Sequence, residues 1–349
     1  MTENKNKNGV LYFLNPNKKF RSDSFGLTAR FLDILPKEEV GKIFNNQYME
    51  NKNSLAHLEF HKPVLLNEVV SLLAPQANER LIDATVGTGG HLLALFEKTA
   101  GRLKALAIDK NSRSLKLAQL RLSRFAKNIV FVREDFANLK TVARRAGFLE
   151  VEMILFDLGV ASWQFQDENL GLSFAKDAPL DMRLSEKGSK TAFVVVNNYN
   201  RADLERVIRE YGEEKEYKKI ADFIIRARPI YSTKELADVV TKAKKETFPK
   251  KIHPATKVFQ AIRIEVNEEL SALEEGLKAA LEILATGGRL AVISYHSLED
   301  RIVKRLFLTK KREGGFLLLT KKPLQPTPQE VYINPSSRSA KLRVIKKLT

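Results

Sequence analysis

A glycine-rich turn between two apolar segments constrains this chain more than any other feature. The apolar, β-branched run 81–86 is followed by Gly87, Gly89 and Gly90, and then by a leucine- and alanine-rich segment over 91–98. This pattern predicts a buried strand, a turn and a helix. Because glycine lacks a Cβ, the turn can adopt positive φ angles and let a ligand approach the backbone, while the helix N-terminus offers unpaired N–H donors. We therefore expect a nucleotide-like ligand at this turn.

Acidic or aromatic residues follow the ends of the next predicted strands. Asp109 ends the second strand, where an acid can accept both hydroxyls of a ribose. Phe136 lies just beyond the third strand, and Asp157 ends the fourth. Taken singly, Asp109 could be a helix N-cap and Phe136 a core residue. Together, at the carboxyl ends of consecutive strands in an open α/β sheet, they favour a ligand-binding crevice. These strands are predicted over 103–108, 129–133 and 152–157.

The glycine spacing leaves the class of cofactor open. It does not fit G-x-G-x-x-G, because the third glycine of that pattern falls on Leu92, and it lacks the G-K-[ST] of a P-loop. The absence of cysteine excludes disulfides, cysteine-based zinc sites and thiol nucleophiles. The five histidines show no H-E-x-x-H spacing, so we expect no protein-held metal. Because no apolar run is long enough for a membrane span or a signal peptide, we expect a soluble, cytoplasmic protein.

Positive charge is concentrated at the C-terminal end of the chain. The formal net charge is +17, and residues 301–349 supply +11 of it with 13 basic and 2 acidic residues. Such a segment attracts a polyanion such as RNA, with an affinity that falls steeply with salt. An ordinary solvated surface is the alternative explanation for the same charge.

The hydrophobic periodicity divides the chain into three parts. Strands and helices alternate over 57–164 and again over 271–349, which predicts a mostly parallel α/β sheet with right-handed crossovers. Residues 165–270 have helical periodicity throughout, so we predict an all-helical domain inserted into the sheet domain, where it covers or shapes the crevice. Residues 1–56 form an N-terminal extension that we expect to be flexible or lightly docked. Helices are predicted near 28–44 and over 61–73, 112–125, 138–147, 202–211, 215–227, 233–245 and 258–283, and further strands over 288–294, 316–320 and 340–346.

Several longer motifs occur in one order along the chain, and together they closely resemble the bacterial ribosomal RNA small subunit methyltransferase H family. The resemblance covers about residues 57–349. The motifs are His61-Lys62-Pro63-Val64-Leu65-Leu66, Asp83-Ala84-Thr85-Val86-Gly87-Thr88-Gly89-Gly90-His91, Asp157-Leu158-Gly159-Val160-Ala161-Ser162, Pro179-Leu180-Asp181-Met182-Arg183, Tyr211-Gly212-Glu213-Glu214, His253-Pro254-Ala255-Thr256, His296-Ser297-Leu298-Glu299-Asp300-Arg301 and Asn334-Pro335-Ser336-Ser337-Arg338-Ser339-Ala340-Lys341-Leu342-Arg343.

This resemblance implies a class I, Rossmann-like S-adenosylmethionine-dependent methyltransferase with an inserted helical domain. It implies methylation of the exocyclic N4 amine of a cytidine in 16S rRNA near the decoding centre, with that RNA or the small ribosomal subunit as the partner. Carried over by position, the residues implied to contact the cofactor are Gly89, Gly90, His91, Asp109, Phe136, Asp157 and Gln164.

The chemistry of the implied reaction suggests catalytic candidates. Methyl transfer from a sulfonium requires an in-line arrangement and the exclusion of water. The lone pair of the target amine is delocalised into the pyrimidine ring, so a nearby acceptor must draw off a proton. We hypothesise that Asp157 positions the methionine end or the amine, with Asp181 and His296 as further candidates for accepting the proton. Replacement of Asp157 by alanine is expected to abolish turnover.

Polar residues among apolar helix positions suggest contacts to the substrate. Arg263 and Asn267 are four residues apart and share a helix face. With His253 and Ser294 they are candidates for cytidine recognition, in a deep pocket that receives a base splayed out of its stack. A buried structural network is the alternative for the same residues. Trp163, where the family usually has proline, could either pack or stack on a base.

Two other functions fit parts of the sequence. An amino methyltransferase acting on DNA is disfavoured because the segment after Asp157 lacks the usual Pro-Pro-aromatic pattern. A non-catalytic ribosome assembly or RNA-binding factor with the same fold is disfavoured by the intact Gly89, Asp109 and Asp157. A thermal shift with S-adenosylmethionine separates an enzyme from such a factor, because a bound ligand stabilises the folded state.

Overall fold

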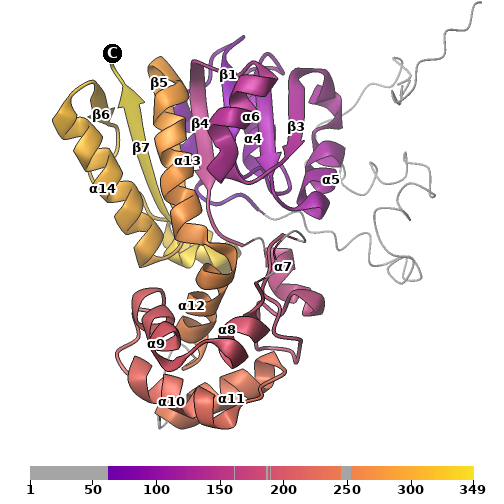
Figure 1. Ribbon diagram of the computed structural model, residues 1–349. Coiled ribbons are helices and arrows are strands. Elements are labelled where there is room, and N and C mark those ends of the chain that lie inside the picture. The colour runs from indigo at the N-terminus through magenta and orange to yellow at the C-terminus, as the bar shows by residue number, and fades with distance from the viewer. Residues whose placement is uncertain (1–61, 161, 186–187, 189, 245–252) are drawn as a thin grey trace, which may run out of the picture. The chain divides into compact units, whose positions relative to one another are not determined.

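The computed structural model describes residues 62–160, 162–185, 188, 190–244 and 253–349 (Figure 1). The predicted N-terminal extension over 1–56 and the predicted helix near 28–44 lie outside these ranges. No helix among the described residues is long and apolar enough to cross a membrane.

A seven-stranded sheet organises the N- and C-terminal parts of the described chain. Its strand order is β3-β2-β1-β4-β5-β7-β6. The first five strands in this order run parallel, whereas β7 lies antiparallel between β5 and β6. The α/β fold predicted from the sequence is therefore confirmed. The strands are β1 (Arg80–Asp83), β2 (Lys104–Asp109), β3 (Ile129–Arg133), β4 (Val151–Asp157), β5 (Leu284–Ser294), β6 (Phe316–Leu318) and β7 (Lys341–Lys347).

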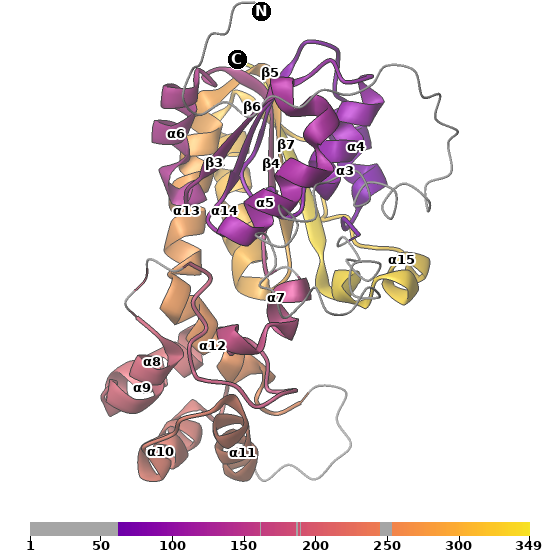
Figure 2. The same cartoon turned by 90° about the vertical axis from the view of Figure 1, so that its right-hand side faces the viewer.

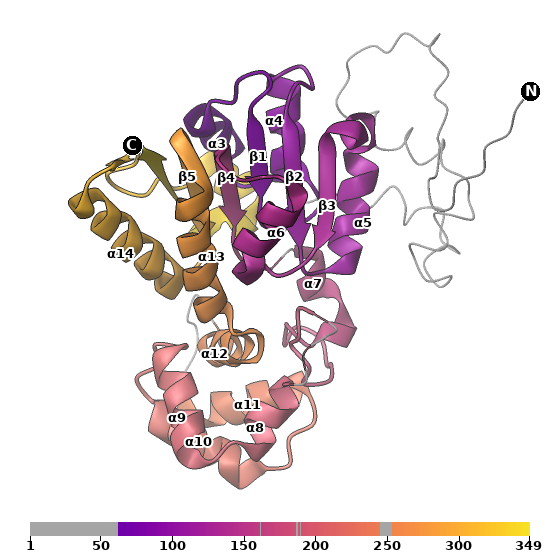
Figure 3. The ribbon, with the colours of Figure 1, turned by 45° about the horizontal axis from the view of Figure 1, so that its top comes forward.

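Both faces of the sheet are buried under helices. Side chains alternate along each central strand, so that Leu81 and Met153 point into one core while Ile82 and Ile154 point into the other. One face is covered by α3 (Leu66–Leu73), α4 (Gly90–Lys98) and α5 (Ser112–Arg121). The other is covered by α6 (Leu139–Ala146), α13 (Glu269–Ile283) and α14 (Ser297–Glu313), as Figures 1 and 3 show.

A group of helices between β4 and α13 has a hydrophobic core of its own, which contains residues from Leu172 to Val266. Figure 2 shows these helices gathered together at one end of the sheet. The exact limits of the insert, predicted as 165–270, stay a prediction. The helices of this core are α8 (Ala192–Asn198), α9 (Arg201–Glu210), α10 (Tyr217–Ala227), α11 (Thr233–Lys244) and α12 (Thr256–Asn267).

Short elements complete the described chain. They are α7 (Ser162–Gln166), α15 (Pro328–Ile333) and the 3-10 segments Ser123–Asn128, Phe136–Asn138, Glu168–Leu170 and Pro335–Ser339. The predicted continuous helix over 258–283 is wrong, because Glu268 adopts a left-handed conformation with φ 52° and separates α12 from α13. The predicted helix over 61–73 is too long, because Leu65 is also left-handed, with φ 54°, and α3 begins after it.

Candidate functional site

The glycine turn joins β1 to α4 in a conformation that needs glycine. Gly87 and Gly89 have φ angles of +51° and +78°. A Cβ on Gly89 would lie 2.9 Å from Cδ1 of Leu122, whereas the nearest atom to a Cβ on Gly87 would be a carbonyl oxygen at 3.9 Å. Gly89 therefore packs closely against the C-terminal end of α5. Gly87 faces more open space, where a ligand can approach the backbone.

The carboxylate of Asp109, at the end of β2, is tied directly to this turn. Its Oδ2 accepts a hydrogen bond of 2.9 Å from the Gly87 N–H, and its Oδ1 accepts one of 2.8 Å from the Asn111 N–H. Burial raises the pKa of Asp109 to about 6, against the lowering effect of these two hydrogen bonds. The alternative role of Asp109 as a helix N-cap is excluded, because Asn111 caps α5 by accepting from the Ser114 N–H.

Asp157, at the end of β4, lies between two side chains from other parts of the fold. The hydroxyl of Tyr295 donates a hydrogen bond of 2.8 Å to Oδ1 of Asp157. Nδ1 of His91 lies 3.5 Å from Oδ2, and Nε2 of the same ring lies 2.9 Å from the Val64 carbonyl oxygen. Because a carbonyl oxygen only accepts, Nε2 donates to Val64; in a neutral ring Nδ1 is then unprotonated, and the buried ring of His91 packs beside the Asp157 carboxylate without donating to it.

A third carboxylate, Asp83, lies between these two and was not predicted as a site residue. The strand register pairs Asp83 with Ala107 on β2 and with Leu155 on β4, two residues short of Asp109 and Asp157 respectively. Asp83 is 2% exposed, and burial raises its pKa to about 8; the hydrogen bond from the Thr85 N–H lowers it, and the charges of Asp157 and Asp109 raise it further. The carboxyl ends of three adjacent strands thus gather three acids beside the glycine turn.

Two of the predicted cofactor residues are placed in well-packed surroundings. The ring of Phe136 lies edge to face with Phe156, with 5.6 Å between centroids. A Cβ on Gly276 of α13 would lie 2.9 Å from Cδ2 of Phe136, so this side of the Phe136 ring packs on α13. Gln164, on α7, is 6% exposed.

Trp163 borders a cavity of about 200 Å³ at the ends of β2 and β3. The guanidinium of Arg113 lies 4.6 Å from the centroid of the Trp163 ring. The indole N–H is buried and has no hydrogen-bond acceptor among the described residues. The cavity is lined by Lys110, Asn111, Ser112, Arg113, Arg133, Trp163, Asp167, Leu170, Asp181, Arg183, Leu184 and Ser185.

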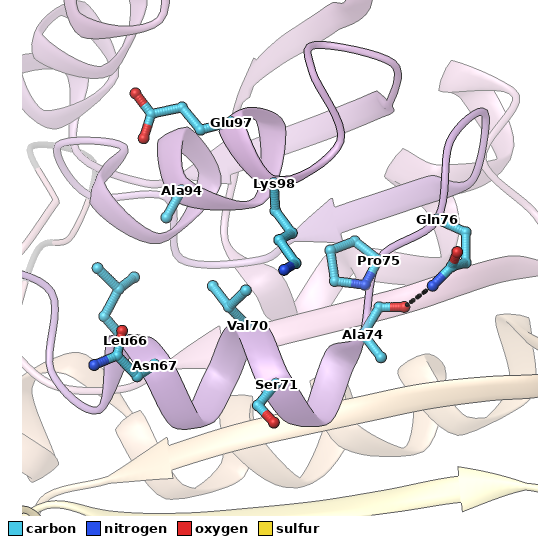
Figure 4. A pocket seen from close by; sticks show the side chains of 10 residues that line it. All are labelled: Leu66, Asn67, Val70, Ser71, Ala74, Pro75, Gln76, Ala94, Glu97 and Lys98. Atoms are coloured by element: carbon cyan, nitrogen blue, oxygen red, sulfur yellow. Dashed lines mark hydrogen bonds between the residues drawn. The ribbon is translucent and has the colours of Figure 1, made fainter. Parts of the chain in front are cut away.

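A larger cavity, of about 600 Å³, lies between α3 and α4 (Figure 4). Its lining, which includes Val70, Pro75, Ala94 and Lys98, contains none of the residues predicted to bind cofactor or substrate. The candidate chemistry therefore lies at the strand ends and not in this cavity.

Asp181 is poorly suited to accept a proton. The guanidinium of Arg183 donates hydrogen bonds of 2.8 and 2.7 Å to its two carboxylate oxygens. Burial alone would raise the pKa of Asp181, but the hydrogen bonds and charge of Arg183 outweigh burial and hold the pKa below its usual value. A carboxylate bound in this way is a weak base.

His296 belongs to a buried cluster of charged side chains. Its Nδ1 accepts a hydrogen bond from the Glu299 N–H at the start of α14. In a neutral ring, the proton is therefore on Nε2, which lies 3.3 Å from Glu299 Oε1 but is not aligned for a hydrogen bond with any described residue. One ligand atom each from Glu269, His296 and Glu299 lies within 4.8 Å of the others, close enough to share a cation. However, Arg263 already occupies both oxygens of Glu269, and a protonated Nε2 is no ligand.

The predicted substrate residues Arg263 and Asn267 both take part in structural contacts. Arg263 donates hydrogen bonds of 2.8 and 2.9 Å to Glu269. Oδ1 of Asn267 accepts from the Leu184 N–H, and its Nδ2 donates to the carbonyl oxygens of Met182 and Arg263. These bonds join α12 to the loop before α8, which favours the structural alternative for Asn267.

The other two predicted substrate residues differ in accessibility. His253 is partly exposed, and its ring packs on Phe174 with 4.4 Å between centroids. Ser294 is 2% exposed, and its hydroxyl donates to the Lys341 carbonyl oxygen at 3.4 Å. Of the two, His253 has the side chain that a substrate can reach.

Comparison with known proteins identifies the family. The model of the MraW methylase family matches residues 59–348. This chain belongs to the MraW methylase family. The ribosomal RNA small subunit methyltransferase H of Heliobacterium mobile is 41% identical to it, over 83% of this chain and 100% of that protein. The proteins of the same name from Persephonella marina and a Sulfurihydrogenibium species are 44% and 45% identical, over 82% and 81% of this chain and 99% and 98% of theirs. The resemblance found in the sequence is therefore confirmed.

Neither a role for Asp83 at the site nor the contact of Tyr295 with Asp157 was predicted from the sequence. Asp83 was part of the recognised glycine motif, and its position at a strand end was the available signal. Tyr295 follows β5 in the chain and contacts Asp157 from 138 residues away. No local pattern marks such a contact, since only the sheet pairing of β4 with β5 brings the two residues together.

Proposed function

We propose that this methylase transfers a methyl group from S-adenosylmethionine to the exocyclic N4 amine of a cytidine in 16S rRNA, near the decoding centre. The observation that carries the proposal is the carboxylate of Asp157, which accepts a hydrogen bond from the Tyr295 hydroxyl and lies beside the buried ring of His91 near the glycine turn. A methylase family supplies the reaction type, and this carboxylate is the group best placed to act on an amine.

The residues at the strand ends fit S-adenosylmethionine. Gly87 leaves the backbone accessible, and Asp109 next to it has a carboxylate that can accept from ribose hydroxyls. Phe136 and Gln164 are proposed at the adenine end and at the loop after β4, and Gly89, Gly90 and His91 at the turn. When bound, the cofactor supplies a methyl group already activated by its sulfonium. What remains for the protein is to orient the amine and to take up its proton.

Asp157 is proposed to orient the amine. One oxygen is engaged by the Tyr295 hydroxyl, which fixes the plane of the carboxylate. A carboxylate has further acceptor positions, so a substrate amine can donate a hydrogen bond to it and be turned toward the methyl group. His296 can accept the proton only if Nδ1 gives up the hydrogen bond from the Glu299 N–H. Asp181 is the weakest of the three, because Arg183 already binds both of its oxygens.

The names of the relatives and the charge of the chain support RNA as the substrate. The similar proteins are named ribosomal RNA small subunit methyltransferases. The basic C-terminal segment suits a polyanion. We propose the 16S rRNA, free or in the small subunit, as the partner, and the cytoplasm as the location. His253, and less strongly Arg263, are proposed to contact the substrate near the insert.

A methylation assay tests the proposal. The purified protein is incubated with S-adenosylmethionine and small-subunit RNA, and the nucleosides are analysed by mass spectrometry. We expect one N4-methylated cytidine, and loss of that methyl group in a strain lacking the gene. A methyl group on another base, or on DNA but not RNA, would refute the assignment of the substrate. Absence of a thermal shift with S-adenosylmethionine would instead indicate a non-catalytic factor.

A further inference from the structure

Helix α15 presents an aromatic side chain almost entirely to solvent. Tyr332 is 88% exposed, and the adjacent Ile333 is 53% exposed. The ring of Tyr332 therefore contributes little to the packing of the fold. A tyrosine so exposed, next to a second exposed apolar residue, is available for contact with another molecule.

The backbone that carries Tyr332 is nevertheless firmly held. The Thr327 side chain caps α15 by accepting from the Glu330 N–H. Oε1 of Glu330 accepts a hydrogen bond of 2.7 Å from the Leu65 N–H, and Asn334 donates one of 3.1 Å to the Lys62 carbonyl oxygen. Because α15 is fixed at both ends, the exposure of Tyr332 belongs to an ordered surface and not to a frayed terminus.

The residues to which α15 is hydrogen-bonded lie next to those of the Asp157 site. Leu65, bound by Glu330, follows Val64, whose carbonyl oxygen lies 2.9 Å from the His91 ring. Burial and then Asp157 raise the pKa of Tyr295, and the nearby charge of Glu330 adds to this effect. In Figure 2, α15 lies at the end of the sheet from which β4 leads into α7. Helix α15 is thus part of the rim of the proposed catalytic site.

The surroundings of α15 favour a polyanion. Between Gly314 and Thr349 the chain has seven Lys or Arg residues, and Glu330 is the single acid. Lys62, Lys321, Lys322 and Arg338 have exposed side chains, while Glu330 is engaged by the Leu65 N–H. An exposed aromatic ring in a basic segment of the chain is a combination that binds single-stranded nucleic acid, by stacking on bases and attracting phosphates.

We propose that Tyr332 stacks on an unpaired nucleotide of the RNA that flanks the target cytidine. This inference rests on the proposed function, because it takes the substrate to be RNA. Stacking outside the catalytic pocket holds the strand next to the site while the target base is splayed out. The surface formed by Tyr332, Ile333 and Arg338 then contributes to binding of the substrate and not to the chemical step.

Binding of a labelled RNA oligonucleotide, followed by fluorescence anisotropy, tests the inference. The probes are a single strand containing one cytidine and the same strand in a duplex. Stacking of one base predicts that Tyr332→Ala weakens single-strand binding about 5- to 100-fold and leaves duplex binding nearly unchanged. Tyr332→Phe, which keeps the ring, should bind like the natural protein. Tyr231→Ala is the matched control, since Tyr231 is 60% exposed and lies on the insert.

The salt dependence separates stacking from charge. Tyr332→Ala should leave the slope of log affinity against log salt unchanged, whereas Arg338→Ala should reduce it by about 1. Unchanged single-strand binding by Tyr332→Ala would overturn the inference, as would an equal loss with Tyr332→Phe. An effect limited to the assembled small subunit and absent with naked RNA would also overturn it, because a ribosomal protein would then be the partner.

Failure of the proposed function would be recognised independently. If the natural protein shows no thermal shift with S-adenosylmethionine and methylates no cytidine, the catalytic assignment fails. The comparison of Tyr332→Ala with Tyr332→Phe on single-stranded RNA still decides whether the ring stacks.

Discussion

The hydroxyl of Tyr295 donates a hydrogen bond of 2.8 Å to Oδ1 of Asp157, and its ring covers Gly159, where a Cβ would lie 3.0 Å from Cδ2. Asp157 ends β4 and Tyr295 follows β5, so the pairing of these strands sets the contact. A carboxylate fixed from the side in this way keeps one orientation toward a substrate. Four of the expected outcomes below concern the acids gathered at this end of the sheet and their partners.

Tyr295→Phe removes the hydrogen bond and leaves the ring in place. We expect kcat/KM for RNA methylation to fall about 10- to 100-fold, because hydrogen bonds to charged groups contribute about 1.5–3 kcal/mol. The thermal shift with S-adenosylmethionine should be retained. An unaltered methylation rate would show that the orientation of Asp157 does not depend on Tyr295.

Asp157→Asn preserves the shape of the side chain but removes its negative charge. If the carboxylate orients the amine and assists removal of its proton, methyl transfer should slow about 10²- to 10⁴-fold, and Asp157→Ala should abolish it. Single-turnover measurement with saturating RNA separates this effect from weaker binding. Near-normal turnover in Asp157→Ala would remove Asp157 from the mechanism.

The affinity for S-adenosylmethionine should depend on pH through Asp109. Its pKa is about 6, so the carboxylate is protonated as the pH falls below this value and loses acceptor capacity for ribose hydroxyls. We expect the Kd from calorimetry to rise up to about tenfold for each pH unit below 6. Asp109→Asn should bind more weakly at pH 7.5 and lose this pH dependence. If the Kd of Asp109→Asn keeps the pH dependence of the natural protein, a group other than Asp109 titrates.

Asp83 should make the folded protein less stable as the pH rises. Its pKa is about 8 in the fold against 3.8 for the ordinary group, so the folded state retains a proton that the unfolded state has lost between these values. The stabilisation is complete below pH 3.8 and disappears as the pH rises through 8. The free energy of unfolding of Asp83→Asn, taken relative to that of the natural protein, should therefore rise by at least about 1 kcal/mol from pH 5 to pH 8.5, since one pKa unit is about 1.4 kcal/mol. Denaturant unfolding at both pH values measures this difference. If the two proteins differ in unfolding free energy by the same amount at both pH values, the pKa of Asp83 is not raised in the fold.

Asn267→Ala distinguishes a structural role from contact with the substrate. The substitution leaves the Leu184 N–H and the Met182 carbonyl oxygen without their side-chain partner. We expect a loss of about 1–3 kcal/mol in the free energy of unfolding, with little change in the KM for RNA among the molecules that remain folded. A large rise in KM at unchanged stability would favour cytidine recognition instead.

Local patterns predicted the strands near the glycine turn well. β2, β3 and β4 lie within one residue of the predicted ranges, because short, mostly apolar runs end there in polar residues. The predicted first strand ran too far, since Ala84 and Val86 belong to the turn after Asp83. β5 begins at Leu284 instead of 288, because Leu284 pairs with Val151 before a register shift in the ladder. That extension depends on a partner far away in the sequence.

Tertiary contacts explain what the sequence did not reveal. Helix α8 contains three consecutive valines, which favour a strand, yet the Thr191 cap and the packing of Val195 and Val196 in the helical core make it helical. The break at Glu268 interrupts a pattern that remains apolar on one face from 258 to 283. The grouping of Asp83, Asp109 and Asp157 was partly predictable, because parallel strands place their carboxyl ends at one edge. The contact of Tyr295 with Asp157 was not.

The insertion between β4 and β5 also determines the order in which the parts of the molecule can fold while the chain is being synthesised. When β4 has been synthesised, its outer edge has no neighbour, and it acquires one only after Leu284–Ser294 has emerged. Helices α8 to α12, with a core of their own, can become compact during that interval. The nascent chain thus carries an open strand edge, which is prone to association with other chains, for as long as translation of the insert takes.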